Sequence, residues 1–145
     1  MDERKGWLDE RKGWVSPGRM PRQLLVAEIL TGLAAFGAAF ESLFGALCLA
    51  TTGSIYMTVA GQELRLDARV DILIFGPIAV AAALACWHIA RMRALPTTLF
   101  AFAVWLGVGV ATGEAYPAIG SQLLIACLAP LALVAWCRAD FEPGS

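Results

Sequence analysis

The chain is poor in the residues on which most enzymes and cofactor sites depend. Its 145 residues include one histidine, His88, and four cysteines without a Cys-x-x-Cys pair. A single histidine excludes bis-histidine haem ligation within one chain, and thiol-disulfide oxidoreductases normally need the Cys-x-x-Cys pair. No glycine-rich phosphate loop, nucleophile elbow or zinc-protease helix motif occurs either. We therefore expect a protein that is not an enzyme and that binds no cofactor and no metal.

Charged residues are also scarce, at 16% of the chain, whereas hydrophobic residues make up 59%. Together with a mean hydropathy of +0.67, this composition is typical of an integral membrane protein and not of a soluble domain. The net charge of −1 gives no reason to expect a nucleic-acid partner. The lipid bilayer is the first expected partner.

Long apolar runs predict an all-α bundle of four transmembrane helices, because a span needs about 20 mostly apolar residues. The expected spans are 24–50, 70–89, 95–112 and 119–136 within a membrane domain at 24–136, flanked by tails at 1–23 and 137–145. Prolines support these boundaries. Three of them precede or open a span, where the missing N–H removes no intrahelical hydrogen bond, and two lie inside spans. The first group is Pro21, Pro96 and Pro117, and the second is Pro77 and Pro130.

The positive charges are distributed unequally between the two ends of the predicted bundle. Nine Lys and Arg residues lie before the first span, between the second and third, or after the fourth. Only Arg65 and Arg69 lie in the loop between the first two spans. The positive-inside rule therefore predicts that both termini are cytoplasmic. The richness in Ala, Gly and Leu suits the plasma membrane of a bacterium, its inner membrane.

The N-terminal tail carries a tandem heptapeptide repeat, DERKGWL followed by DERKGWV at 2–15. The seven-residue spacing places Trp7 and Trp14 on one side of a helix, which favours an amphipathic helix on the inner leaflet or on a partner. Each unit also contains a glycine, which disfavours a helix and favours a duplicated flexible tail. Both interpretations remain open.

The loop between the first two spans predicts a short β-hairpin at 54–69. Charged and apolar residues alternate from Glu63 to Asp71, residues 55–59 are rich in β-branched and aromatic side chains, and 60–62 can form the turn. A lone hairpin is marginally stable in water, so it should rest on the loop at 113–116, on the membrane or on another subunit. It would cap the bundle or recognise a ligand or partner.

Glu41 is the outstanding residue, because it lies deep inside the first apolar span. A charge near the bilayer centre costs at least ~2.5–3.5 kcal/mol, so such residues usually face protein or water. Glu28 lies closer to the inner surface, near Arg22 and the arginines at 91 and 93, and about 140° around the helix from Glu41. The two carboxylates should not share one cavity. We expect Asp71 and Glu114 at the outer ends of their spans, within reach of water.

Small residues indicate which helix faces approach other helices closely. Gly37, Glu41 and Gly45 recur every four residues and form one ridge, which should pack against protein. Gly109 and Gly113 form a GxxxG pair, which indicates close contact within the bundle or between subunits. The apolar cores of the other spans contain no Lys or Arg, so Glu41 needs another partner. The candidates are water, a second subunit, Thr97, Thr98, Thr112, Ser121 and Gln122.

Two short segments, AVWLGVGV at 103–110 and PAIG at 117–120, resemble fragments of small multidrug-resistance transporters, as does a glutamate in the first helix. That family lacks the charged N-terminal repeat and the outer hairpin, and it separates the two segments by a longer stretch. The resemblance implies a proton-coupled carrier.

Two functional hypotheses follow. The first is a non-catalytic accessory or assembly subunit of a larger membrane complex or homo-oligomer, in which protonated Glu41 donates a hydrogen bond between helices. Its partners would be other membrane subunits or further copies of the chain. The second is a small oligomeric proton- or cation-coupled transporter or pore that uses Glu41.

Overall fold

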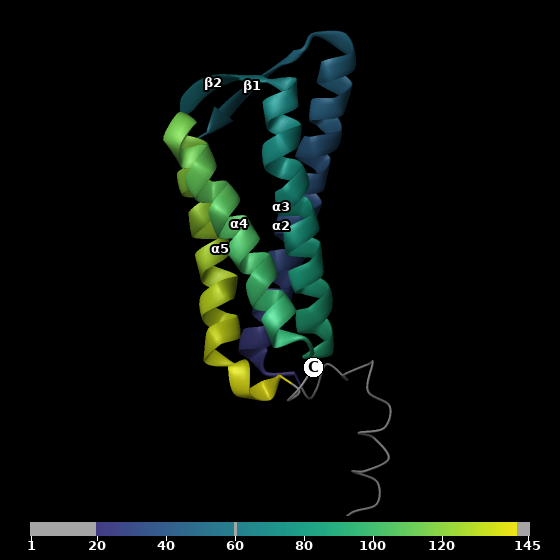
Figure 1. The fold of residues 1–145 in the computed structure, drawn as a ribbon, viewed down its shortest axis with the longest axis vertical. Helices are drawn as coiled ribbons and strands as arrows, with labels where there is room; N and C mark the ends of the chain where they lie inside the picture. The colour runs from purple at the N-terminus through teal and green to yellow at the C-terminus, as the bar shows by residue number, and fades with distance from the viewer. Residues whose placement is uncertain (1–19, 60, 142–145) are drawn as a thin grey trace, which may run out of the picture.

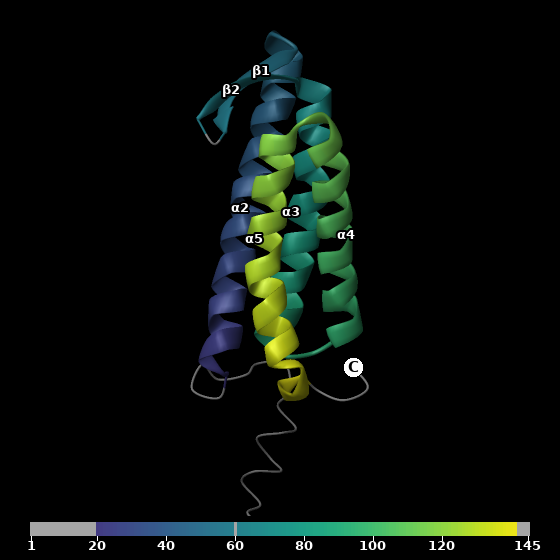
Figure 2. The same cartoon turned by 90° about the vertical axis from the view of Figure 1, so that its left-hand side faces the viewer.

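The computed structural model describes residues 20–59 and 61–141, which form four long helices of alternating direction (Figure 1). The helices are α2 (Arg22–Thr51), α3 (Ala68–Arg91), α4 (Leu95–Ala115) and α5 (Pro117–Trp136). Each helix contacts its two neighbours in a closed ring, in the order α2, α3, α4, α5 (Figure 2). All four are long and apolar enough to cross a membrane. The predicted four-helix membrane bundle is confirmed, and the N-terminal repeat lies outside the described residues.

The prolines lie where the sequence predicts. Pro21 caps the start of α2, Pro96 lies in the first turn of α4, and Pro117 is the first residue of α5. Pro77 lies inside α3 and Pro130 inside α5. After α5, a single turn of 3-10 helix, η1 (Arg138–Asp140), follows at the end where α2 begins (Figure 1).

An antiparallel hairpin joins α2 to α3 at the opposite end of the bundle (Figure 1). Strands β1 (Ser54–Val59) and β2 (Gln62–Asp67) pair Ile55 with Leu66, and both side chains are buried. These two apolar residues anchor a hairpin that would be marginally stable alone. The predicted hairpin is confirmed, but it does not extend to residue 69.

The second strand ends early because Asp67 caps the next helix. Its carboxylate accepts a hydrogen bond from the Arg69 backbone N–H at 2.8 Å, which satisfies one of the free N–H groups at the start of α3. The alternating pattern that runs on to Asp71 therefore crosses a strand-to-helix boundary. Asp71 belongs to the first turn of α3.

Glycines bring α4 and α5 into backbone contact. A Cβ atom placed on Gly120 would collide with the backbone of Gly113 and lie 2.8 Å from the Gly109 carbonyl oxygen. Gly109 in turn faces the Leu124 side chain. The predicted glycine pair thus lies against α5 of the same chain.

Candidate functional site: a cavity beneath the hairpin

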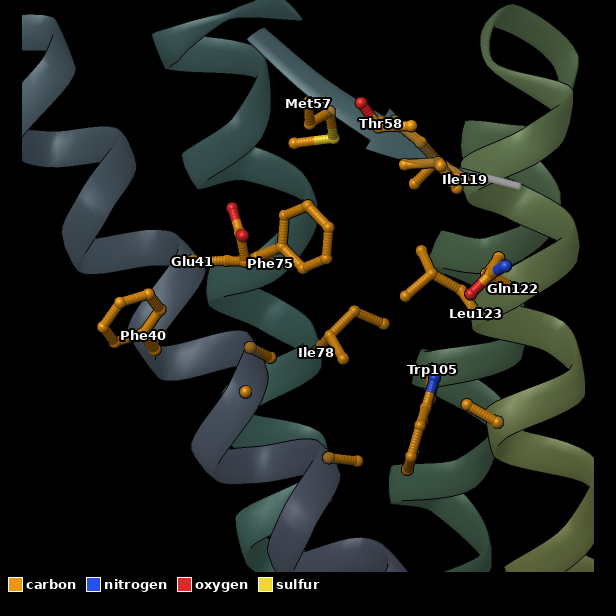
Figure 3. A pocket seen from close by; sticks show the side chains of 15 residues that line it. Phe40, Glu41, Met57, Thr58, Phe75, Ile78, Trp105, Ile119, Gln122 and Leu123 are labelled. Atoms are coloured by element: carbon orange, nitrogen blue, oxygen red, sulfur yellow. The ribbon is translucent and has the colours of Figure 1, made fainter. Parts of the chain in front are cut away.

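A cavity of about 480 Å³ lies among the four helices directly beneath β1 (Figure 3). All four helices contribute to its walls, and Met57, Thr58 and Val59 of β1 cover it from above. Its lining is mostly apolar. The polar side chains in it are those of Glu41, Thr58, Trp105 and Gln122. A site of this size and character is typical of small-molecule pockets.

Glu41 projects from α2 into this cavity (Figure 3). Its Oε2 atom is buried and has no hydrogen-bond partner within the described part of the chain. Of the five neutral side chains expected as partners, Gln122 lines the same cavity and the other four do not. Two of those four bond to their own helices: Thr98 donates to the Ala94 carbonyl at 3.1 Å, and Ser121 to the Pro117 carbonyl at 2.7 Å.

Asp71 on the neighbouring helix lies against Gly45, one helical turn beyond Glu41, and the two carboxylates interact electrostatically. Its side chain is 0% exposed, and neither carboxylate oxygen has a hydrogen-bond partner among residues 20–59 and 61–141. The expectation that water reaches Asp71 is wrong. Because α2 continues for six residues beyond Gly45, and the carboxylate lies against Gly45, the start of α3 is buried by α2. Glu114, at the outer end of α4, is exposed.

The glycine ridge of α2 is divided between two environments. A Cβ atom on Gly45 would lie 2.5 Å from Oδ2 of Asp71 and 3.1 Å from Cγ1 of Ile72. A Cβ atom on Gly37 would meet nothing within 4 Å, because Gly37 borders the cavity. The ridge therefore packs against α3 at Gly45, whereas at Gly37 it borders the cavity.

Glu28 lies apart from this site, as the helical geometry predicts. It is half-buried, and its backbone carbonyl accepts hydrogen bonds from Thr31 Oγ1 at 3.0 Å and Cys86 Sγ at 3.5 Å. Its predicted pairing with an arginine stays a prediction. At the same end of the bundle, the Arg91 guanidinium lies 4.0 Å from the centre of the Trp87 ring, a cation–π contact.

Trp105 also lines the cavity, which sequence reasoning did not predict. It is 1% exposed, stacks on Phe102 at 6.1 Å between ring centres, and lines the cavity. Its Nε1 atom is buried without a hydrogen-bond partner in the described chain, and Figure 3 shows it at the end of the ring nearer the hairpin. The sequence feature that set Trp105 apart was its position in the middle of the third span.

The fold and this site define a class, a polytopic helical membrane protein with an acidic cavity inside an apolar bundle. The chain matches no protein-family model, no curated protein and no solved structure. The short resemblance to small multidrug-resistance transporters is therefore not accompanied by a family match. Within the described residues, no three or more His, Cys, Asp or Glu side chains are grouped so that they could hold a metal ion.

Proposed function

We propose that this protein is a non-catalytic accessory or assembly subunit, which joins a larger membrane complex or a homo-oligomer through α2. It would reside in a bacterial inner membrane with both termini in the cytoplasm, as the arginine and lysine distribution favours. Its partners would be other membrane subunits or further copies of itself.

A row of large apolar side chains along α2 carries this proposal. The seven residues follow one another at alternating intervals of three and four positions, and each is between 46% and 74% exposed. We call this row the α2 seam: Val26, Ile29, Leu33, Phe36, Phe40, Leu43 and Leu47.

Intervals of three and four are the repeat by which two helices pack side chains into each other's gaps. Exposed apolar residues on a membrane helix also face lipid, so apolar character alone does not indicate a partner. The α2 seam differs in being unbroken over seven large residues, on the least buried of the four helices. The corresponding exposed face of α3 is interrupted by Pro77.

The test compares two phenylalanines of similar exposure. Phe36 in the α2 seam is 74% exposed and Phe100 on α4 is 70% exposed. In a mild detergent, Phe36→Ala should reduce co-purification of a differently tagged second copy, or of a partner subunit, by about tenfold, which corresponds to ~1.4 kcal/mol. Phe100→Ala should have no effect. Equal behaviour of the two variants, or a wild-type protein that is monomeric without partners, would contradict the proposal.

A second candidate is a small oligomeric proton- or cation-coupled carrier or pore, and the cavity around Glu41 favours it. Glutamine keeps the hydrogen-bonding shape of glutamate but cannot titrate. In proteoliposomes, Glu41→Gln should abolish proton-linked flux while Glu114→Gln, at an exposed position, should preserve it. Flux that survives Glu41→Gln would exclude this mechanism.

A further inference from the structure

We propose that the cavity beneath the hairpin binds a lipophilic amine that also carries a hydrogen-bond-accepting oxygen. The ammonium group would bond to Glu41, and the oxygen would accept the indole N–H of Trp105. This inference concerns binding within one chain and does not depend on the α2 seam.

The charges around the cavity favour an ammonium group. Among the described residues, Oε2 of Glu41 is buried without a hydrogen-bond partner, and the buried Asp71 carboxylate interacts with it electrostatically. No Lys, Arg or His is among the residues that line the cavity in the described chain. An ammonium group supplies the missing donor in a charge-assisted hydrogen bond, whereas a phosphate or carboxylate would be repelled.

Trp105 provides an independent indication of a ligand. Its N–H can only donate, it is buried, and it has no acceptor within the described residues. A buried polar group without a partner is unfavourable, so a ligand oxygen next to it would be stabilising. The Trp105 and Glu41 side chains project into the cavity from opposite walls, α4 and α2 (Figure 3). A ligand that satisfies both therefore carries its two polar groups at separate points.

The walls and the opening of the cavity indicate what the non-polar part of the ligand must be. Phe75 and Trp105 contribute aromatic rings, which suit both an apolar chain and a nearby cation. The exposed lining residues on the helices are Gly37 and Phe40 of α2, and Gln122 and Ala126 of α5. The cavity is thus open between α2 and α5, at the outer surface of a bundle whose helices are long and apolar enough to cross a membrane. The ligand is therefore lipophilic and enters from the bilayer.

Binding can be measured by the fluorescence of Trp105. The protein would carry Phe at its other four tryptophans, at positions 7, 14, 87 and 136, and the probe would be dodecylamine with a bromine at the end of its chain, which quenches a nearby indole. Brominated dodecanol and dodecanoate are the matched probes. The amine should bind about tenfold more tightly than the alcohol, and the carboxylate should bind most weakly. An alkyl ether amine of equal length should bind roughly fivefold more tightly than dodecylamine, because its oxygen meets Trp105.

Two variants locate the site. Glu41→Gln should weaken the amine about tenfold and leave the alcohol unchanged, which also shows that the cavity remains folded. Glu114→Gln is the matched control and should change neither. Gly37→Leu, at a position with free space, should fill the cavity and abolish quenching by every probe.

Three results would overturn the proposal as a whole, and a fourth would overturn its Trp105 part. Equal affinity for amine and alcohol would exclude recognition by charge. Unchanged amine binding in Glu41→Gln would exclude the carboxylate as the partner. Quenching that persists in Gly37→Leu would show that the probes only partition into the detergent. An ether amine no tighter than dodecylamine would overturn the part assigned to Trp105.

Discussion

In the part of the chain that the structure describes, Glu41, Asp71 and Trp105 have buried polar side-chain atoms without a hydrogen-bond partner. Each such group typically costs about 1–3 kcal/mol when it is buried without a hydrogen bond. Folded proteins keep few of them, and those they keep often mark a site where something binds. The three residues come from three different helices, so the bundle as a whole brings them together.

At the residue scale, Gly45 and Gly37 should respond in opposite ways to alanine. The added methyl group of Gly45→Ala would press against the buried Asp71 carboxylate and Ile72, and it should destabilise the protein by about 1–3 kcal/mol. Gly37→Ala meets free space and should stabilise α2 by up to about 1 kcal/mol through helix propensity. The midpoint of unfolding by SDS in mixed micelles measures both.

The double variant Gly45→Ala with Asp71→Ala serves as the control. Removing the Asp71 carboxylate makes room for the new methyl group, so much of the lost stability should return. Equal stability of Gly45→Ala and Gly37→Ala would contradict the close approach of α2 to Asp71.

The burial of Asp71 could not be predicted from the alternating pattern of charged and apolar residues. Strict alternation from Glu63 to Asp71 predicted a strand, and Asp71 was expected within reach of water because it lies at the outer end of the second span. The alternation is real, but a pattern with a period of two does not show where a strand gives way to a helix. Asp67 was the available indication, because aspartate is a preferred residue at the start of a helix. Burial of Asp71 also depends on how far α2 extends beyond Gly45, where it packs against Asp71. This packing is a property of the tertiary structure.

At the scale of elements, the pairing of α4 with α5 depends on Gly120. A side chain there would meet backbone atoms of Gly113 and Gly109, which cannot move aside without separating the helices. Gly120→Ala should therefore cost about 3 kcal/mol, at the upper end of what overpacking usually costs. Gly107→Ala, on the exposed face of α4 with nothing within 4 Å, should be neutral or slightly stabilising.

SDS unfolding of these two variants in one detergent provides the comparison. A Gly120→Ala protein as stable as Gly107→Ala would mean that the two helices do not touch through their backbones. The GxxxG pair on α4 predicted a close helix contact but left open whether that contact lies within the bundle or between subunits. Only the three-dimensional arrangement identifies Gly120, which has no GxxxG pattern on its own helix.

At the scale of the whole molecule, the hairpin and the η1 turn lie at opposite ends of the bundle (Figure 1). If both termini are cytoplasmic, Glu63 in β2 faces the outside and Arg138 in η1 faces the cytoplasm, and both are exposed. In a protein without its four native cysteines, Glu63→Cys should react with a membrane-impermeant maleimide on intact cells. Arg138→Cys should react only after permeabilisation, and the reverse pattern would show the opposite orientation.

The whole architecture was more predictable than the site. The four spans, their bounding prolines and the hairpin follow from apolar length, helix-breaking residues and alternation, which are local properties of the chain. The cavity, by contrast, depends on residues from several elements that are far apart in the sequence. It arises because β1 covers a space that Gly37 and the neighbouring small residues of α2 leave open, and because Trp105 reaches that space from α4. No segment of the sequence contains this information alone.

The opening between α2 and α5 would affect how affinity for the proposed amine is measured. If the bundle lies in a bilayer, acyl chains and the amine would compete for the same space, so that binding would exchange one apolar occupant for another. The concentration that governs occupancy is then the mole fraction of ligand among lipids, not its concentration in water. Membranes with different acyl chains should therefore shift the apparent affinity of the same protein without any change in its residues.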